Sequence, residues 1–272
     1  MTAQTPMLKQ YFDIRAENPG VLLAMRVGDF YEFYGPDAET AAQVLGITLT
    51  GRDDKGDRIP MAGVPFHAVE RYLARLVAGG HKVALCEQLE DAKHAKGLVR
   101  RGVSRVLTPG TVLDEAMLEA GANNFLAAIC RIEGKIGFAY LDASTGEFLA
   151  TELIGDGAAD RLLQELARVR PAELLAGEEM EEIGDLAHTG LGSAVSSELA
   201  PKAALATRRL QERFEVETLA GFGLEEKPSA VAAAAMVLGY AERSGPLAYV
   251  EGVRAYSSDA FLTMDPATRR AL

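Results

Sequence analysis

The stretch RVGDFYEFYGPDAETAA, residues 26–42, joins an aromatic-rich half to an alanine-rich half. The aromatic half continues the apolar run at 21–27, and β-branched and aromatic residues of this kind are typical of strands. The alanine-rich half predicts a helix with Asp37 as its N-cap residue and Gly46 at its end. A strand that leads directly into a helix indicates a mixed α/β domain.

The segments that follow continue this alternation. An amphipathic helix is predicted at 67–80, because Val69, Leu73 and Leu76 fall on one of its faces and two glycines end it. The remaining predicted elements are a strand at 47–50, a polar turn at 52–58, and strands at 82–88 and 103–111. All of them belong to a first α/β domain, which we place at residues 1–112.

A linker at 113–121 is expected to lead into a second α/β domain at 122–252. Three apolar runs between residues 125 and 153 are separated by the turn sequences EGK and STGE, a pattern that predicts an antiparallel meander. The elements predicted after the meander are helices at 160–169, 201–214 and 230–243 and a short buried strand at 172–177. Residues 253–272 end inside a helix signal, so we expect them to begin a further domain.

The net charge of −11 argues against a general nucleic-acid coat. The charge is uneven, because residues 1–115 hold 14 basic and 15 acidic side chains, against 14 and 24 in the remainder. Within the first part, residues 93–105 carry Lys93, Lys96, Arg100, Arg101 and Arg105 and no acidic residue. Such a cluster is able to neutralise phosphates, although a basic run is also commonly a solvated face.

Several classes of protein are excluded or disfavoured. No run approaches the roughly 18 consecutive apolar residues of a membrane span, and the N-terminus lacks the layout of a signal peptide. Cys86 and Cys130 lie far apart without a CxxC spacing, which favours neither a disulfide framework nor a zinc site. The four histidines are also separated. We therefore expect a soluble intracellular protein without a metal site.

No known catalytic motif is present, and Asp142 is the one residue that suggests catalysis. The sequence has no GxxxxGK[ST], GxSxG, HExxH or strand-linked GxGxxG motif. A carboxylate in such a meander is where ribonuclease-H-like nucleases hold a metal, but a nuclease needs further carboxylates for two metals. The acids at 178–185 fit a solvated helix face better. We expect Asp142 to stabilise a turn and expect no catalytic residue.

The face of the strand that carries Phe30 has two interpretations. Alternation places Phe30 and Glu32 on one face and Tyr31 on the other. An aromatic residue in a strand is most often part of the core. A carboxylate beside it is unfavourable there, because a buried charge needs a partner. The alternative is an exposed face on which the aromatic ring and the acid act together.

Ordered motifs make the chain similar to a known family. These are GDFYEFY (28–34), RIPMAGVPFHAVERYLARLV (58–77), KVALCEQLED (82–91) and RVLTPGT (105–111). They resemble the N-terminal region of the MutS family of DNA mismatch-repair proteins. Later segments resemble the connector domain of the family, namely NNFLAAI (123–129), LDASTGEF (141–148) and LAGFGLE (219–225). The segment MDPATRRAL (264–272) resembles the start of its core domain.

The resemblance implies roles for individual residues in binding mispaired or looped-out bases in duplex DNA. Phe30 would enter the minor groove and stack on the mispaired base, and Glu32 would hydrogen-bond to that base. Insertion of a wedge costs a few kcal/mol of unstacking, so a deformable mispair is favoured over a matched pair. The residues implied as contacts to the DNA backbone are Arg52, Met61, Arg71 and Arg105.

The resemblance also implies how the domains cooperate. The connector, with a ribonuclease-H-like fold used without catalysis, would relay nucleotide state and dock a MutL-type partner. The family forms homodimeric clamps in the cytoplasm, on the nucleoid. Its ATPase, with ATP and Mg²⁺, would lie beyond residue 272, so this chain is expected to be neither an enzyme nor a cofactor binder. A stand-alone adaptor or decoy that binds MutL-type partners, and a nuclease using Asp142, remain open alternatives.

Overall fold

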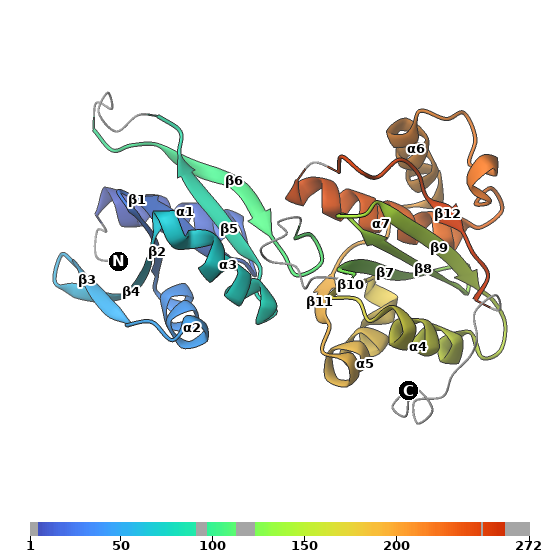
Figure 1. Ribbon diagram of the computed structural model, residues 1–272, viewed down its shortest axis with the longest axis horizontal. Helices are drawn as coiled ribbons and strands as arrows, with labels where there is room; N and C mark the ends of the chain where they lie inside the picture. Colours follow the sequence, from blue (N-terminus) through green and yellow to red (C-terminus); the bar gives the residue numbers. More distant parts are fainter. Residues whose placement is uncertain (1–4, 91–96, 113–122, 246, 259–272) are drawn as a thin grey trace. The chain divides into compact units, whose positions relative to one another are not determined.

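The computed structural model of the protein describes residues 5–90, 97–112, 123–245 and 247–258 (Figure 1). The chain divides into two compact units, Met1–Ala120 and Gly121–Leu272. The predicted linker at 113–121 lies outside the described residues, as do Lys93, Lys96 and most of the predicted further domain. Both units are built on mixed sheets, so the predicted α/β class is confirmed. None of the described helices has the length and apolar character of a membrane span.

The first unit is a six-stranded sheet with the strand order β3-β4-β2-β1-β5-β6. Only the β1–β5 pair is parallel, and the other neighbours are antiparallel. The strands are β1 (Leu22–Val27), β2 (Phe30–Tyr34), β3 (Thr50–Asp54), β4 (Asp57–Pro65), β5 (Val83–Gln88) and β6 (Arg101–Leu107). The helices are α1 (Pro6–Glu17), α2 (Pro36–Leu45) and α3 (Val69–Ala78), with a short 3-10 turn at Phe66–Ala68.

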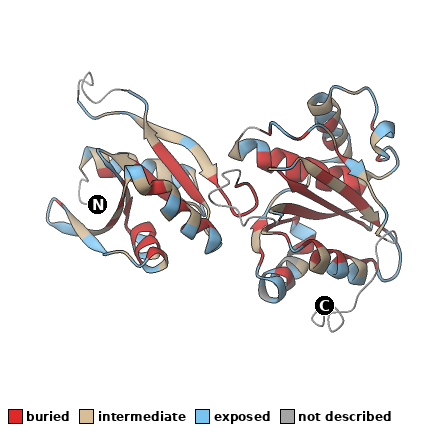
Figure 2. Ribbon diagram, in the orientation of Figure 1, coloured by how far each residue is buried: buried red, intermediate tan, exposed pale blue. Residues whose placement is uncertain are grey.

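Each face of this sheet packs against different helices. Helices α2 and α3 cover the face that carries Tyr31 and Phe33, and the apolar stripe predicted for α3 is buried there. Helix α1 covers the other face with only two fully buried side chains, Leu8 and Tyr11. Because half of the other residues of α1 are apolar and are spread around the helix, its sequence carries no strong periodic signal. Figure 2 shows the buried residues concentrated along the strands between these helices.

Asp37 does not cap α2, contrary to the prediction. The helix begins after Gly35, whose φ of 58° is the positive value that favours glycine, and Asp37 lies inside the first turn. Its carboxylate is only 2% exposed and accepts hydrogen bonds from the Leu23 backbone N–H at 3.1 Å and from Arg15 at 3.0 Å. The position of Asp37 before an alanine run suggested a helix cap. Its hydrogen bonds to residues distant in the sequence give it a different role, that of a buried link between elements.

The polar turn predicted at 52–58 is confined to Lys55 and Gly56, because its other residues belong to the strands of a hairpin. The predicted strand at 47–50 is wrong for three of its four residues. Strand β3 begins at Thr50, and the chain reverses at Lys55 and Gly56, which have φ values of 51° and 106°. Two central residues with positive φ are what a tight two-residue hairpin requires. The strands on both sides therefore extend into the charged residues.

The second unit is also a six-stranded sheet, with the order β11-β10-β7-β8-β9-β12. Strands β7, β8 and β9 pair in antiparallel fashion, which confirms the meander, and β10 lies parallel to β7. The strands are β7 (Phe125–Ile132), β8 (Lys135–Asp142), β9 (Glu147–Leu153), β10 (Glu173–Ala176), β11 (Ala194–Ser197) and β12 (Arg254–Ala255). The helices are α4 (Ala158–Val169), α5 (Glu181–Leu191), α6 (Ala203–Phe214) and α7 (Pro228–Ser244), with short 3-10 turns at Glu178–Met180 and Ala220–Phe222.

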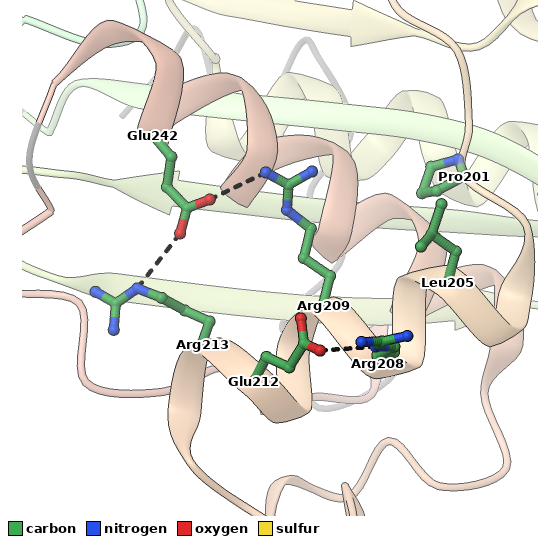
Figure 3. A pocket seen from close by; sticks show the side chains of 7 residues that line it. All are labelled: Pro201, Leu205, Arg208, Arg209, Glu212, Arg213 and Glu242. Carbon is green, nitrogen blue, oxygen red and sulfur yellow. Dashed lines mark hydrogen bonds and ion pairs between the residues drawn. The ribbon is translucent and has the colours of Figure 1, made fainter.

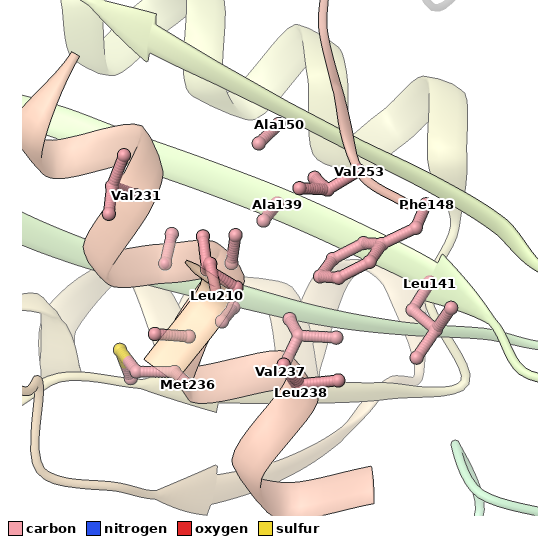
Figure 4. Close-up of a cluster of buried hydrophobic side chains, with 14 of the residues drawn as sticks. Ala139, Leu141, Phe148, Ala150, Leu210, Val231, Met236, Val237, Leu238 and Val253 are labelled. Carbon is pink, nitrogen blue, oxygen red and sulfur yellow. The ribbon is translucent and has the colours of Figure 1, made fainter. Parts of the chain in front are cut away.

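Helix α7 is the centre of the larger core of this unit. It is buried continuously from Ser229 to Ala241, and its side chains share a core with those of β7. Figure 4 shows the same core where side chains of α7 meet those of β8, β9 and α6. Its alanines permit a close approach to the sheet, and at Gly137 of β8 a Cβ atom would lie 1.9 Å from the Ser229 carbonyl oxygen. Helices α4 and α5 pack on the opposite face. The sheet therefore has helices on both faces.

Candidate nucleic-acid interface

Phe30 is an exposed aromatic residue at the start of β2. Its side chain is 47% exposed, whereas the next residue, Tyr31, is 3% exposed in the core under α2 and α3. Its neighbours across the ladder are Val27 on β1 and Pro65 on β4. The alternation predicted from sequence is therefore confirmed, and of the two interpretations of Phe30 the surface one holds.

The turn that carries Phe30 is held by contacts on its flanks. Arg26 donates a hydrogen bond from Nε to the Gly28 carbonyl at 2.7 Å, and its guanidinium lies 3.4 Å above the ring of Phe66. The Phe66 backbone N–H in turn donates to the Asp29 carbonyl at 2.8 Å. Sequence reasoning assigned no role to Arg26 or Phe66, because both contacts depend on the β1–β2 turn meeting the end of β4. They restrain the backbone from which Phe30 projects.

Glu32 has protein partners on the same face as Phe30. Its side chain is 14% exposed, and its Oε2 accepts a hydrogen bond from Arg52 Nη1 at 3.2 Å and one from the Tyr34 hydroxyl. Arg52 Nη1 also donates to the Tyr34 hydroxyl oxygen at 2.7 Å. The charge that looked difficult to accommodate is therefore paired. The same alternation that places Phe30 and Glu32 on one face also places Tyr34 there. Strand alternation was therefore the sequence signal from which Tyr34 could have been predicted as a neighbour of Glu32.

Gly63 leaves the surface between Phe30 and Glu32 uncovered. It pairs with Glu32 across the β2–β4 ladder, so a side chain at this position would point to the same face. A Cβ atom there would lie 3.7 Å from Glu32 Cγ and 4.0 Å from Phe30 Cδ1. Because glycine has no side chain, the aromatic ring and the carboxylate are presented side by side.

A buried hydrogen-bond network supports this face from below. The Tyr34 backbone N–H donates to the Tyr11 hydroxyl oxygen at 3.1 Å, and that hydroxyl lies 3.0 Å from Asp37 Oδ2. The rings of Tyr11 and Tyr34 meet edge to face with centroids 5.0 Å apart. Burial raises the pKa of Tyr34, and the Glu32 carboxylate raises it further. Both tyrosine hydroxyls therefore stay protonated at neutral pH, because burial and Asp37 raise the pKa of Tyr11 as well.

The other predicted DNA contacts divide between the two faces of the sheet. Met61 of β4 pairs with Tyr34 of β2 and is half-buried on the same face of the sheet. Arg71 lies on α3, over the opposite face, with its guanidinium 5.1 Å from the Tyr72 ring. Arg105 is also on that side, in an ion pair with Glu70 of α3 at 2.5 Å.

The basic residues at 93–105 do not form one surface where the structure describes them. Arg101 donates to the Arg26 carbonyl at 2.9 Å and to Gln10 of α1 at 3.1 Å, whereas Arg105 reaches α3. In the β5–β6 pairing Leu85 faces Arg105 and Cys86 faces Val103, so Ser104 is an extra residue in β6. Such a bulge reverses the alternation of side chains, and residues four apart consequently point to opposite faces.

In the second unit, Asp142 stabilises a turn, as predicted. Its carboxylate is buried and accepts hydrogen bonds from the Ser144 hydroxyl at 2.6 Å, the Ser144 backbone N–H at 2.9 Å and the Asn124 backbone N–H at 3.2 Å. Among the described residues, no group of three or more His, Cys, Asp or Glu side chains has a geometry that suits a metal ion. The carboxylate is thus engaged in holding the β8–β9 connection.

A cavity of about 540 Å³ lies on the surface formed by α6 and the end of α7 (Figure 3). Each of its arginines is paired with a glutamate: Arg209 and Arg213 approach Glu242 at 3.0 and 3.5 Å, and Arg208 approaches Glu212 at 2.7 Å. The three arginines share two glutamates, so the lining keeps one net positive charge, and every arginine is already in an ion pair.

Comparison with known proteins relates both units to one family. The profile of MutS domain I matches residues 5–116, and that of MutS domain II matches residues 124–244. The DNA mismatch repair protein MutS of Symbiobacterium thermophilum is 43% identical over 98% of this chain and 32% of its own length. The proteins of the same name from Methanosarcina barkeri and Syntrophomonas wolfei are 42% and 41% identical, over 98% and 100% of this chain and 32% and 33% of their own lengths. The chain thus spans about a third of the length of these relatives.

Proposed function

The chain belongs to the MutS family, and from this premise we propose that it recognises mispaired or looped-out bases in duplex DNA through Phe30 and Glu32. The observation that carries the proposal is the exposed Phe30 ring beside a carboxylate that the sheet already holds in place. In this function Phe30 is inserted from the minor groove and stacks on the mispaired base. Glu32 accepts a hydrogen bond from the same base.

Discrimination in this proposal rests on how easily the duplex deforms. Insertion of an aromatic wedge costs a few kcal/mol of unstacking per step, and a mispair has already lost part of its pairing energy. The hydrogen-bonding pattern of the minor groove is degenerate and supplies little sequence information. Binding to a matched pair requires the full deformation energy and leaves Glu32 near phosphate without a hydrogen-bond donor from a base. Both effects lower the affinity for matched duplex.

The neighbouring cations compensate for an acid near DNA. Arg52 is already paired with Glu32, and its remaining N–H groups are available to a phosphate. We propose that Arg52 and Met61 meet the backbone beside the mispair. Arg71 and Arg105 lie on the α3 side of the sheet and would contact the duplex where it passes that side. Contacts of this kind position a protein without reading sequence.

The second unit is proposed to act as a connector and partner-docking domain. Residues 116–272 hold 14 basic and 24 acidic side chains, a balance that suits a protein partner better than DNA. A MutL-type partner, a homodimer, an ATPase module with ATP and Mg²⁺, and a cytoplasmic, nucleoid-associated location remain predictions from the family. The adaptor alternative differs in requiring partner binding that does not depend on Phe30. No catalytic step is proposed for this chain.

The proposal is tested by measuring the affinity of the chain for a duplex with one central mispair and for its matched counterpart. In the Phe30→Ala variant we expect the affinity for the mispaired duplex to fall about 5- to 150-fold, because stacking of a base on an aromatic ring is worth about 1–3 kcal/mol. The affinity for the matched duplex should hardly change. Tyr249→Ala is the matched control, because Tyr249 is an exposed aromatic residue of the second unit. Equal discrimination by the Phe30→Ala variant and the unmodified chain would refute the wedge.

A further inference from the structure

We infer that Tyr34 is a positioning residue for base selection: its hydroxyl, together with Arg52, fixes one oxygen of Glu32 and leaves the other as an acceptor for a mispaired base that carries an imino N–H. This inference rests on the proposed function and adds to it the residue that orients the acid. Tyr34 does not touch the base. It acts through Glu32.

The polar contacts of Glu32 converge on a single oxygen. The Tyr34 hydroxyl and Arg52 Nη1 both donate to Oε2, and they are joined to each other by a 2.7 Å hydrogen bond. Two donors on one oxygen restrain the position of that oxygen, and charge-assisted hydrogen bonds of this kind are among the stronger ones. Within the part of the chain that the structure describes, Oε1 accepts no hydrogen bond, and the Glu32 side chain stands beside Gly63, which adds no side chain of its own.

The donor at Tyr34 is itself held rigidly. Its ring is fully buried and packs edge to face on Tyr11, and its backbone N–H is bound by the Tyr11 hydroxyl. Because burial and the Glu32 charge both raise the pKa of Tyr34, the hydroxyl carries a proton at neutral pH. Tyr34 is therefore a donor that does not need to be ordered when DNA binds.

A carboxylate oxygen presented in this way selects between bases. An ionised carboxylate is an acceptor only. The ring nitrogen at the centre of the Watson–Crick edge carries a hydrogen in thymine and guanine and a lone pair in adenine and cytosine. An imino N–H is therefore attracted to Oε1, whereas a lone pair is repelled by it. Specificity of this kind arises from the repulsive case as much as from the attractive one.

The test is a double-mutant cycle with duplexes that contain one unpaired thymine or, at the same position, one unpaired adenine. The measured quantity is the ratio of the two dissociation constants for each variant. Tyr34→Phe removes only the hydroxyl, and we expect it to lower the preference for thymine about 3- to 10-fold, part of the value of a charge-assisted hydrogen bond. In a Glu32→Gln background the same substitution should change the ratio less than about twofold, because a residue that acts through Glu32 is coupled to it.

The outcomes separate the inference from the function on which it rests. An unchanged ratio in the Tyr34→Phe variant, or an equal loss in both backgrounds, overturns the inference while the preference for unpaired bases over matched duplex still supports the proposed function. Absence of that preference in the unmodified chain refutes both. Arg52→Gln is a second variant that removes the other donor, and it should lower the ratio in the same direction. Thermal unfolding of each variant establishes that it is folded.

Discussion

Replacement of the buried Asp37 by alanine should destabilise the first unit more than replacement of an exposed carboxylate of that unit. Asp37 looks from its position like a helix cap, but it is buried between α1, β1 and α2. Its carboxylate binds Arg15 of α1 at 2.9 Å, the Leu23 backbone N–H of β1 at 3.1 Å and the Tyr11 hydroxyl at 3.0 Å. One side chain of α2 thus joins this helix to α1 and to β1.

The magnitude follows from which groups lose their partner. In the Asp37→Ala variant the buried Leu23 N–H has no acceptor, whereas the Tyr11 hydroxyl retains the Leu23 carbonyl at 3.0 Å. A buried polar group left without a partner costs about 1–3 kcal/mol, and the lost hydrogen bond from Tyr11 adds about 1 kcal/mol. Arg15 is 38% exposed and can be hydrated, so its contribution is small. We expect a loss of about 2–4 kcal/mol.

The assay is urea unfolding followed by tyrosine fluorescence, since the chain contains no tryptophan. Hydrogen exchange of the Leu23 amide provides a local readout, and its protection should fall further than that of the other β1 amides. Asp53→Ala is the control, because Asp53 is an exposed carboxylate on β3 of the same unit. A loss below about 1 kcal/mol, with Leu23 still protected, would refute the accounting, because it would mean that water replaces the carboxylate at little cost.

Two further predictions concern the packing of the cores. Gly137→Ala should destabilise the second unit by more than about 2 kcal/mol in urea unfolding, because its Cβ would lie 1.9 Å from the Ser229 carbonyl oxygen and the backbone would have to move. Gly190→Ala, where no atom lies within 4 Å of the added Cβ, is the control and should not destabilise the protein. Burial raises the pKa of Cys86 to about 11 and that of Cys130 to about 12 from an ordinary value of 9.0, so both thiols should resist a thiol reagent at pH 8 until the chain is unfolded. Fast labelling of the native protein at pH 8 would contradict the buried placement. The unfolded chain loses these thiol protons at lower pH than the folded chain does. The contribution of the thiols to the free energy of unfolding should therefore be complete below pH 9 and decline as the pH rises toward 11 and 12.

Hydrophobic periodicity and turn signals correctly predicted the elements whose pattern is contained within a short stretch of sequence. The stripe on α3 and the β7–β9 meander both follow from patterns within a few turns or strands. Helix α1 was not predicted because its stability depends on Leu8 and Tyr11 meeting distant strands. Asp37 was misassigned for the same reason. An aspartate before an alanine-rich helix is typical of a helix cap. Here the contacts of Asp37 with three residues distant in the sequence outweigh that local preference.

The candidate site was predictable to the extent that it follows strand alternation. The shared face of Phe30 and Glu32 came from the two-residue period of β2. Arg52 became a partner of Glu32 only through the registers of β3, β4 and β2, which sequence does not display. The bulge at Ser104 was equally invisible, and it separates arginines that looked like one cluster. Long-range register and local irregularity are therefore what the sequence left open.

Strand β2 serves two surfaces at once, and this restricts the length of the segment as well as its composition. Phe30 and Glu32 face outward, Tyr31 and Phe33 face the core, and Gly28 and Gly35 bound the strand with positive φ values of 58°. Gain or loss of a single codon between the glycines would send every later side chain to the opposite face. Such an event would bury the acid and expose the core aromatics together. The gene segment encoding residues 28–35 can therefore tolerate some substitutions, but it has no tolerance for a single-codon change in length.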